Sequence, residues 1–377
     1  MPSMLDGPFR FLPAAALAAV TVATAPFMGL VRDWLFDLAG ASAVKLLAGA
    51  LGLIAVAVLV TAIARIRENR PPRYAALVGV AGLLILQTVA LGTGSAKVDV
   101  VEKIHILQYG ALAFLLYRAL LPRDRVAEIT TLVLPIIWAG LAGVADESAQ
   151  GFFRFRVADI RDVWLNLLAA ACGLLLALAL VPPKGWRSGS TAPGDRSLKT
   201  TLRWLAVLVL VIGAFFDTVH LGHMVDDDEI GRFRSWFSQQ ELLALSEDRA
   251  ARWPESPPGD RAWNRKDFYL WEAARHANHR NASYKAGHWT LAWQANRILE
   301  RYYGPFLDLP EYRGAGRHRY LPATHEKLRN KATPDPRTYL SDVQKGVVFV
   351  WPRGLFIAAV LSLAAFLGSL SVRPTAR

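Results

Sequence analysis

Apolar residues along the chain gather into long blocks that are separated by shorter polar stretches. The blocks cover about 11–31, 43–64, 74–93, 104–121, 127–145, 163–182, 203–221 and 347–368. Each is close to the roughly 20 apolar residues that a helix needs to cross a bilayer. The pattern predicts an all-α protein, a polytopic bundle of about eight transmembrane helices. Pro26 lies near the end of the first block, which is long for a signal peptide, so we expect an uncleaved span.

The stretch between the seventh and eighth blocks has the composition of a folded domain. It covers about 226–346 and holds six of the twelve tryptophans. Helical spacing predicts helices over 264–281 and 284–303. In the second of these, Leu291, Ala295, Ile298 and Tyr302 share one face. We therefore expect a small, mostly helical extracytoplasmic domain that is attached to the membrane at both ends.

These features divide the chain into six parts. They are two leading helices with a basic cytoplasmic loop (1–73), a four-helix membrane core (74–182), a cytoplasmic linker (183–202), the seventh helix (203–225), the extracytoplasmic domain (226–346) and the eighth helix with a cytoplasmic tail (347–377).

The net charge of +12 fits this topology. Lys and Arg gather in the loops after the second, fourth and sixth blocks and at the C-terminus, and cytoplasmic loops carry such an excess. We therefore place both termini in the cytoplasm. The bilayer, not nucleic acid, accounts for the charge. The single cysteine, Cys172, lies in an apolar block, so an intrachain disulfide and a Cys-based metal site are excluded, and we expect no cofactor.

Three polar stretches then fall on the outer side, at 101–110, 146–150 and 154–166. Residues four apart share a helix face. Three such pairs occur here: His105 with Tyr109, Asp146 with Gln150, and Asp162 with Asn166.

Charges within a membrane are costly and tend to face the bundle interior in pairs. We expect Asp146 or Glu147 to pair with Lys103 or Arg156. The alternative is a purely structural role, in which Asp159 caps the sixth helix and the other polar groups join helices.

The same residues resemble the VanZ-like family of bacterial membrane proteins. That pattern has a Lys and a His before a Tyr one turn later, then DExxQ, then an Arg, an Asp and N-x-x-G-x-x-x-G. Ala169 stands where a Gly is common, and Phe155 where a Pro is common. The resemblance covers about 74–182. The matching residues are Lys103, His105, Tyr109, Asp146, Glu147, Gln150, Arg156, Asp162, Asn166 and Gly173.

The resemblance implies an inner-membrane protein linked to the cell envelope and, through the family's namesake, to glycopeptide resistance. We expect the matching residues to bind or modulate an envelope component. This could be an anionic lipid-linked precursor, a polysaccharide or an amphiphilic antibiotic. One alternative is an enzyme that modifies an envelope lipid, with Glu147 and His105 as acid and base. Another is a scaffold that binds an unidentified protein through the extracytoplasmic domain.

One further group of side chains has weak metal-site character. Glu272, His276 and His279 lie at helical spacing on one face and could approach a zinc ion together. Their spacing matches no metalloprotease motif, and histidines on a solvated helix face are commoner. We therefore expect no metal here.

Overall fold

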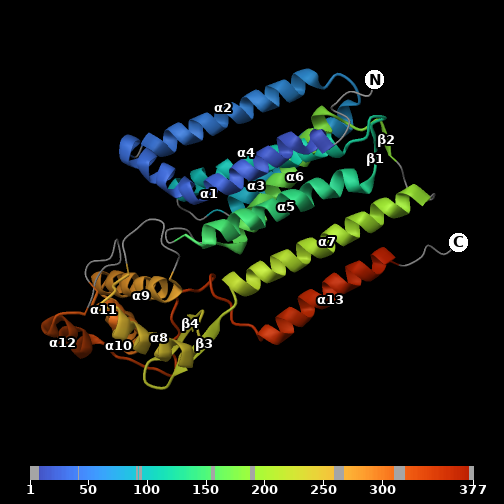
Figure 1. The fold of residues 1–377 in the computed structure, drawn as a ribbon. Coiled ribbons are helices and arrows are strands. Elements are labelled where there is room, and N and C mark those ends of the chain that lie inside the picture. The colour runs from blue at the N-terminus through green and yellow to red at the C-terminus, as the bar shows by residue number, and fades with distance from the viewer. Residues whose placement is uncertain are drawn as a thin grey trace. The chain divides into compact units, whose positions relative to one another are not determined.

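The computed structural model describes residues 8–40, 42–90, 92, 96–153, 158–186, 192–258, 267–309 and 319–372. The chain forms two compact units. The first comprises Met1–Gln150, Arg156–Phe215 and Ile357–Arg377, and the second comprises Gly151–Phe155 and Phe216–Phe356. Figure 1 labels their elements, and each unit is described by itself.

Long apolar helices dominate the first unit. In the described part of the chain, seven helices are long and apolar enough to cross a membrane, namely α2–α7 and α13. This makes the chain a multi-pass membrane protein. The helices are α1 (Leu12–Ala39, after a 3₁₀ turn at Pro8–Phe11), α2 (Ser42–Arg65), α3 (Arg70–Ala90), α4 (Ala96–Leu120), α5 (Ile129–Gly151), α6 (Ile160–Leu180), α7 (Ala192–Val219) and α13 (Arg353–Val372).

The first predicted span differs from the others because α1 is bent. Its segments Phe9–Ala25 and Phe27–Ala39 meet at 67°. The break falls at Pro26, which has no backbone N–H to donate within a helix. If the bent pair is one span, the number of candidate spans rises to eight, as the apolar blocks predicted.

Helices α4 and α6 approach each other closely at two glycines. A side chain at Gly173 would overlap the backbone carbonyl of Gly110. Gly143 of α5 likewise leaves room for Asn166 of α6, because a Cβ there would lie 2.9 Å from the Asn166 amide nitrogen. Small residues allow such close backbone approach in membrane helices. They bring polar side chains on α4, α5 and α6 within hydrogen-bonding range.

The opposite ends of these helices are tied together by their loops. Strand β1 (Val126–Ala127) pairs in parallel with β2 (Gly185–Trp186). Arg73, at the start of α3, is buried, and its Nε donates to the carbonyl of Ala179 at 2.6 Å. A guanidinium that satisfies the last carbonyls of α6 is favourable there because that end of a helix carries partial negative charge.

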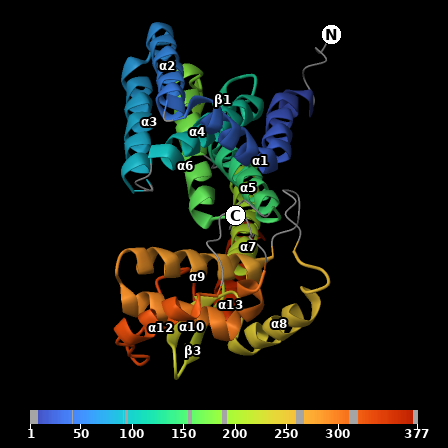
Figure 2. The same ribbon diagram turned by 90° about the vertical axis from the view of Figure 1, so that its left-hand side faces the viewer.

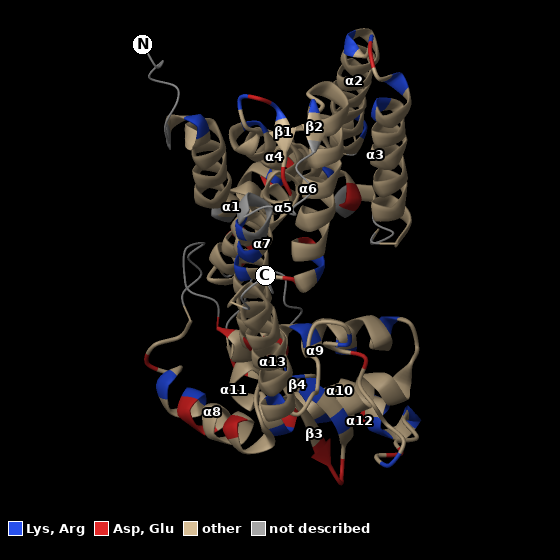
Figure 3. Ribbon diagram, turned by 90° about the vertical axis from the view of Figure 1, so that its right-hand side faces the viewer, with Lys and Arg blue, Asp and Glu red and all other residues tan. Residues whose placement is uncertain are grey.

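The charged residues of the membrane helices lie mostly at helix ends. Figure 3 shows α2 and α3 uncharged along most of their length, with Lys and Arg near the turn between them.

Helix α13 packs closely against α7, because a Cβ at Gly213 would lie 2.5 Å from Val360. The outer helices thus present continuous apolar surface to lipid.

The second unit contains a β-hairpin and several shorter helices. Figure 2 shows α9, α10 and α12 side by side. Their core includes Phe233, Leu242 and Ile298. The elements are β3 (His223–Asp227), β4 (Gly231–Ser235), α8 (Gln239–Arg252), α9 (Phe268–Lys285), α10 (Trp289–Tyr302), α11 (Gly304–Leu307) and α12 (Pro322–Lys331).

Two details of this unit differ from the sequence prediction. The antiparallel β3–β4 pair was not expected in an all-α protein. The two predicted helices exist with different bounds. Helix α9 starts at Phe268 because Asp267 accepts the N–H of Leu270, and α10 begins later than predicted, at Trp289. On α10, Ala295, Ile298 and Tyr302 are buried as expected, whereas Leu291 is exposed.

Candidate functional site

The three polar stretches meet in the first unit, where α4, the end of α5 and the start of α6 come together. Tyr109 donates its hydroxyl to Oδ2 of Asp146 at 2.7 Å. Gln150 donates to Oδ1 of the same carboxylate at 3.1 Å. All three side chains are buried. Both oxygens of Asp146 therefore act as acceptors, and α4 is joined to α5.

Glu147 extends this group toward α6. Its side chain is fully buried, and Oε1 receives a hydrogen bond of 3.4 Å from Gln150. Oε2 receives one of 3.4 Å from the backbone N–H of Asp159. Asp159 is the N-cap of α6 and accepts the N–H of Arg161 at 2.9 Å, as the structural alternative predicted.

His105 and Asn166 form the second polar contact between α4 and α6. The Nδ1 of His105 lies 3.0 Å from Oδ1 of Asn166. Because that oxygen can only accept, His105 carries a proton on Nδ1. The Nδ2 of Asn166 is buried and has no hydrogen-bond partner among the described residues. His105 also stacks on Tyr109, with ring centroids 6.0 Å apart, so the two hydrogen-bonded pairs are adjacent.

An ion pair that the sequence did not reveal borders this group. Arg161 of α6 contacts both carboxylate oxygens of Glu102 on α4, at 2.8 and 2.6 Å. Asp162 lies beside it, with Oδ1 3.4 Å from Arg161. In the sequence, the only indication of this ion pair is that Glu102 and Arg161 carry opposite charges near the starts of their helices.

Of the two cations expected to pair with the cluster carboxylates, the structure describes only Lys103. Among the described residues, Lys103 forms no ion pair with Asp146 or Glu147, and it is exposed. Helical spacing explains this. Lys103 is two residues before His105, so it projects from another side of α4. Arg156 lies outside the described residues.

Six of the family-pattern residues form two hydrogen-bonded sets that meet where His105 stacks on Tyr109, and together we call them the polar cluster. It consists of His105, Tyr109, Asp146, Glu147, Gln150 and Asn166. Asp162 lies next to the neighbouring ion pair instead, and Lys103 lies at the surface. The cluster can hold negative charge, fix one histidine tautomer and offer one amide donor.

The weak metal candidates lie in the second unit, and they do not gather around one point. Glu272 is fully buried and accepts from Ser235, from the N–H of Trp236 and from Tyr303, at 2.6–2.8 Å. His276 is packed between the rings of Phe233 and Tyr303.

The surroundings of these candidates shift their pKa values. Burial raises the pKa of Glu272 to about 7 and lowers the pKa of His276 to about 3. His279 is half-buried, and burial lowers its pKa as well. In the part of the chain that the structure describes, no group of three or more His, Cys, Asp or Glu side chains could hold a metal ion.

Comparisons with protein-family models, with curated proteins and with solved structures found no match to this chain.

Proposed function

We propose that this chain is a VanZ-like protein of the bacterial cytoplasmic membrane that binds or modulates a cell-envelope component through the polar cluster. The observation that carries the proposal is the meeting of the family-pattern residues. Side chains from α4, α5 and α6 that match the pattern hydrogen-bond to one another at one end of the bundle.

The proposed component is anionic and carries a polar headgroup, such as a lipid-linked precursor. Lys103 of α4 is exposed and could offer its ammonium to a phosphate, and Arg161 lies near the start of α6. We place this end of the bundle on the outer side, since the basic loops lie at the opposite ends of α2, α4 and α6. Both termini are then cytoplasmic.

A structural role for the cluster is favoured by a specific observation. Both oxygens of Asp146 and of Glu147 accept hydrogen bonds from protein donors, and both residues are buried. Buried carboxylates whose two oxygens both have protein donors can join helices without any ligand. The enzyme alternative would require Glu147 or His105 to reach a substrate. A scaffold that binds a protein partner through residues 226–346 is the third alternative.

One experiment separates these roles. Envelope lipids and cell-wall fragments are compared by mass spectrometry in the wild type, a deletion strain and a Glu147→Gln strain. The control is Glu128→Gln, which removes the same charge just before the other end of α5. We expect one precursor to change in the deletion and in Glu147→Gln at normal protein level, but not in Glu128→Gln.

Each other outcome selects an alternative. A mass change equal to one chemical group would favour the enzyme. If the deletion has an effect while Glu147→Gln behaves as the wild type, the cluster only joins helices. The binding proposal is then wrong, and the scaffold role is favoured.

A further inference from the structure

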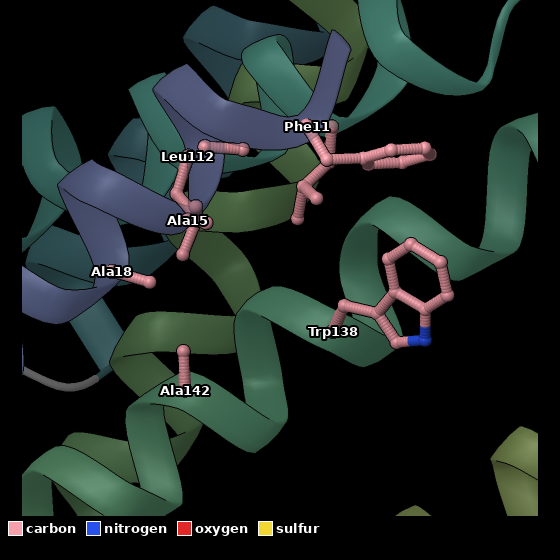
Figure 4. Close-up of a pocket in the computed structure, with 8 residues that line it drawn as sticks. Phe11, Ala15, Ala18, Leu112, Trp138 and Ala142 are labelled. Carbon is pink, nitrogen blue, oxygen red and sulfur yellow. The ribbon is translucent and has the colours of Figure 1, made fainter. Parts of the chain in front are cut away.

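An apolar groove of about 350 Å³ lies between α1, α4 and α5 (Figure 4). Helix α1 lines it with alanines, including Ala15 and Ala18, whose methyl groups leave the space unfilled. Leu112 of α4 and Ala142 of α5 lie on the facing walls. The groove is therefore a hollow made by small side chains on three membrane helices.

The walls continue the helix faces that carry the polar cluster. On α5, Ala142 and Trp138 lie one and two turns from Asp146 at four-residue spacing. On α4, Leu112 follows Tyr109 by three residues and packs in the same apolar group. Eight residues of helix rise about 12 Å. The groove thus begins one turn from the Tyr109–Asp146 hydrogen bond, and its far end at Trp138 lies about that distance from Asp146 along α5.

The environment determines what can fill such a groove. A void whose lining has no partner atoms forfeits dispersion contacts, and an apolar lining offers water no hydrogen bonds. A cavity of about 150 Å³ already accepts benzene, so this groove has room for a longer piece of hydrocarbon. Between membrane helices, lipid chains are the material at hand.

We propose that the groove holds one hydrocarbon chain of a lipid whose headgroup lies at the polar cluster. The placement of the headgroup rests on the proposed function of the polar cluster. The placement of the chain narrows the ligand class to molecules with an alkyl chain. Entry of the chain brings no hydrophobic gain, because bulk lipid is equally apolar. The groove therefore selects by shape and sets the depth of the molecule, while the cluster selects the headgroup.

The test uses the purified full-length chain in phosphatidylcholine nanodiscs. A small fraction of the lipid is phosphatidylglycerol with a diazirine in one acyl chain. After illumination, labelled peptides are mapped by mass spectrometry, with the lipid-exposed helix α2 as the reference for bulk lipid. The variant Ala15→Trp fills the groove. Ala16→Trp is the matched control, because Ala16 is also exposed on α1 but does not line the groove.

We expect label on the segments with Leu112 and Ala142 to exceed label on α2. It should fall to the α2 level in Ala15→Trp and persist in Ala16→Trp, with equal melting temperatures for the two variants. Labelling no higher than α2 in the wild type, or labelling unchanged by Ala15→Trp, overturns the proposal.

The proposed recognition of the headgroup by the polar cluster is tested separately. Suppose that phosphatidylcholine with the same diazirine chain labels the groove equally and that Glu147→Gln changes nothing. The groove then binds chains, but the proposed recognition of a headgroup by the polar cluster is wrong.

Discussion

The two units of this protein expose different kinds of side chain, although both have apolar cores. In the membrane unit, α2 has a mean hydropathy of 2.7 yet is almost wholly exposed, whereas α4 has only 1.2 and carries His105 and Tyr109 inward. In the second unit, Phe233 and Leu242 are inside, and charges lie mainly outside. Large apolar side chains therefore lie both inside and outside the membrane unit, whereas the second unit gathers them mainly in its core.

Helix α9 departs from this rule within the second unit. It buries Glu272, His276 and Arg280 at four-residue spacing. Arg280 donates to Asn296 at 2.9 Å and lies 4.1 Å from the centre of the Tyr320 ring. Burying charge in a protein core is costly unless each group finds partners. Buried, hydrogen-bonded polar groups thus occur inside both units, alongside their apolar cores.

The largest expected effect concerns the packing that brings the polar cluster together. Gly173→Ala should destabilise the bundle by about 3 kcal/mol, because the added methyl overlaps the Gly110 carbonyl and forces α4 and α6 apart. The measurement is the thermal unfolding midpoint of the purified chain in detergent.

The matched control for that variant is Gly52→Ala on α2. A Cβ there has no described atom within 4 Å, so we expect little change. Equal losses of stability in the two variants would mean that the inner and outer helices do not differ in packing.

The next largest effect is the pH dependence of the second unit. The unfolded chain releases the Glu272 proton near pH 4.5 and the folded chain near 7, so this group makes stability fall as the pH rises through that window. The unfolded chain protonates His276 near 6.5 and the folded chain only near 3, so this group makes stability fall as the pH drops. Between pH 4.5 and 6.5 the two slopes, each about 1.4 kcal/mol per pH unit, oppose each other.

Single substitutions should reveal the two slopes. In Glu272→Gln, only the His276 slope remains, so the melting temperature should rise from pH 3 to 6.5. His276→Phe, which keeps the ring contacts with Phe233 and Tyr303, should leave a melting temperature that falls from pH 4.5 to 7. Melting curves of the full-length wild type and of both variants across this pH range check the two slopes. Parallel profiles for all three proteins would contradict the prediction that the two groups have opposite effects.

The smallest of these effects tests a single hydrogen bond in the membrane unit. Tyr109→Phe removes a buried donor to Asp146 and should cost about 1–2 kcal/mol. Tyr74→Phe makes the same change at an exposed tyrosine on α3 and should cost nothing measurable. Thermal unfolding of the two variants provides the comparison. A Tyr109→Phe protein as stable as Tyr74→Phe would show that water replaces the lost donor.

The membrane helices were predictable because lipid requires long apolar segments, and the clustering of polar residues followed from helical spacing and loop charge. The β3–β4 hairpin was missed because a buried strand position is filled by Asp227, which accepts from Tyr302 at 2.6 Å and breaks the apolar alternation. The Glu102–Arg161 ion pair was missed because two distant charges in one sequence do not indicate their contact. Both misses involve charged groups whose partners lie far away in the chain.

The parallel pairing of β1 with β2 has a consequence for biosynthesis. The strand after α4 cannot find its partner until residues 185–186 have left the ribosome, after α5 and α6 have been synthesised. Until then the α4–α5 hairpin lacks both the α6 contacts of Asn166 and this backbone tie. The Tyr109–Asp146 contact can form as soon as α5 is made, whereas the ties to α6 and the β1–β2 pair must wait until the sixth helix is complete.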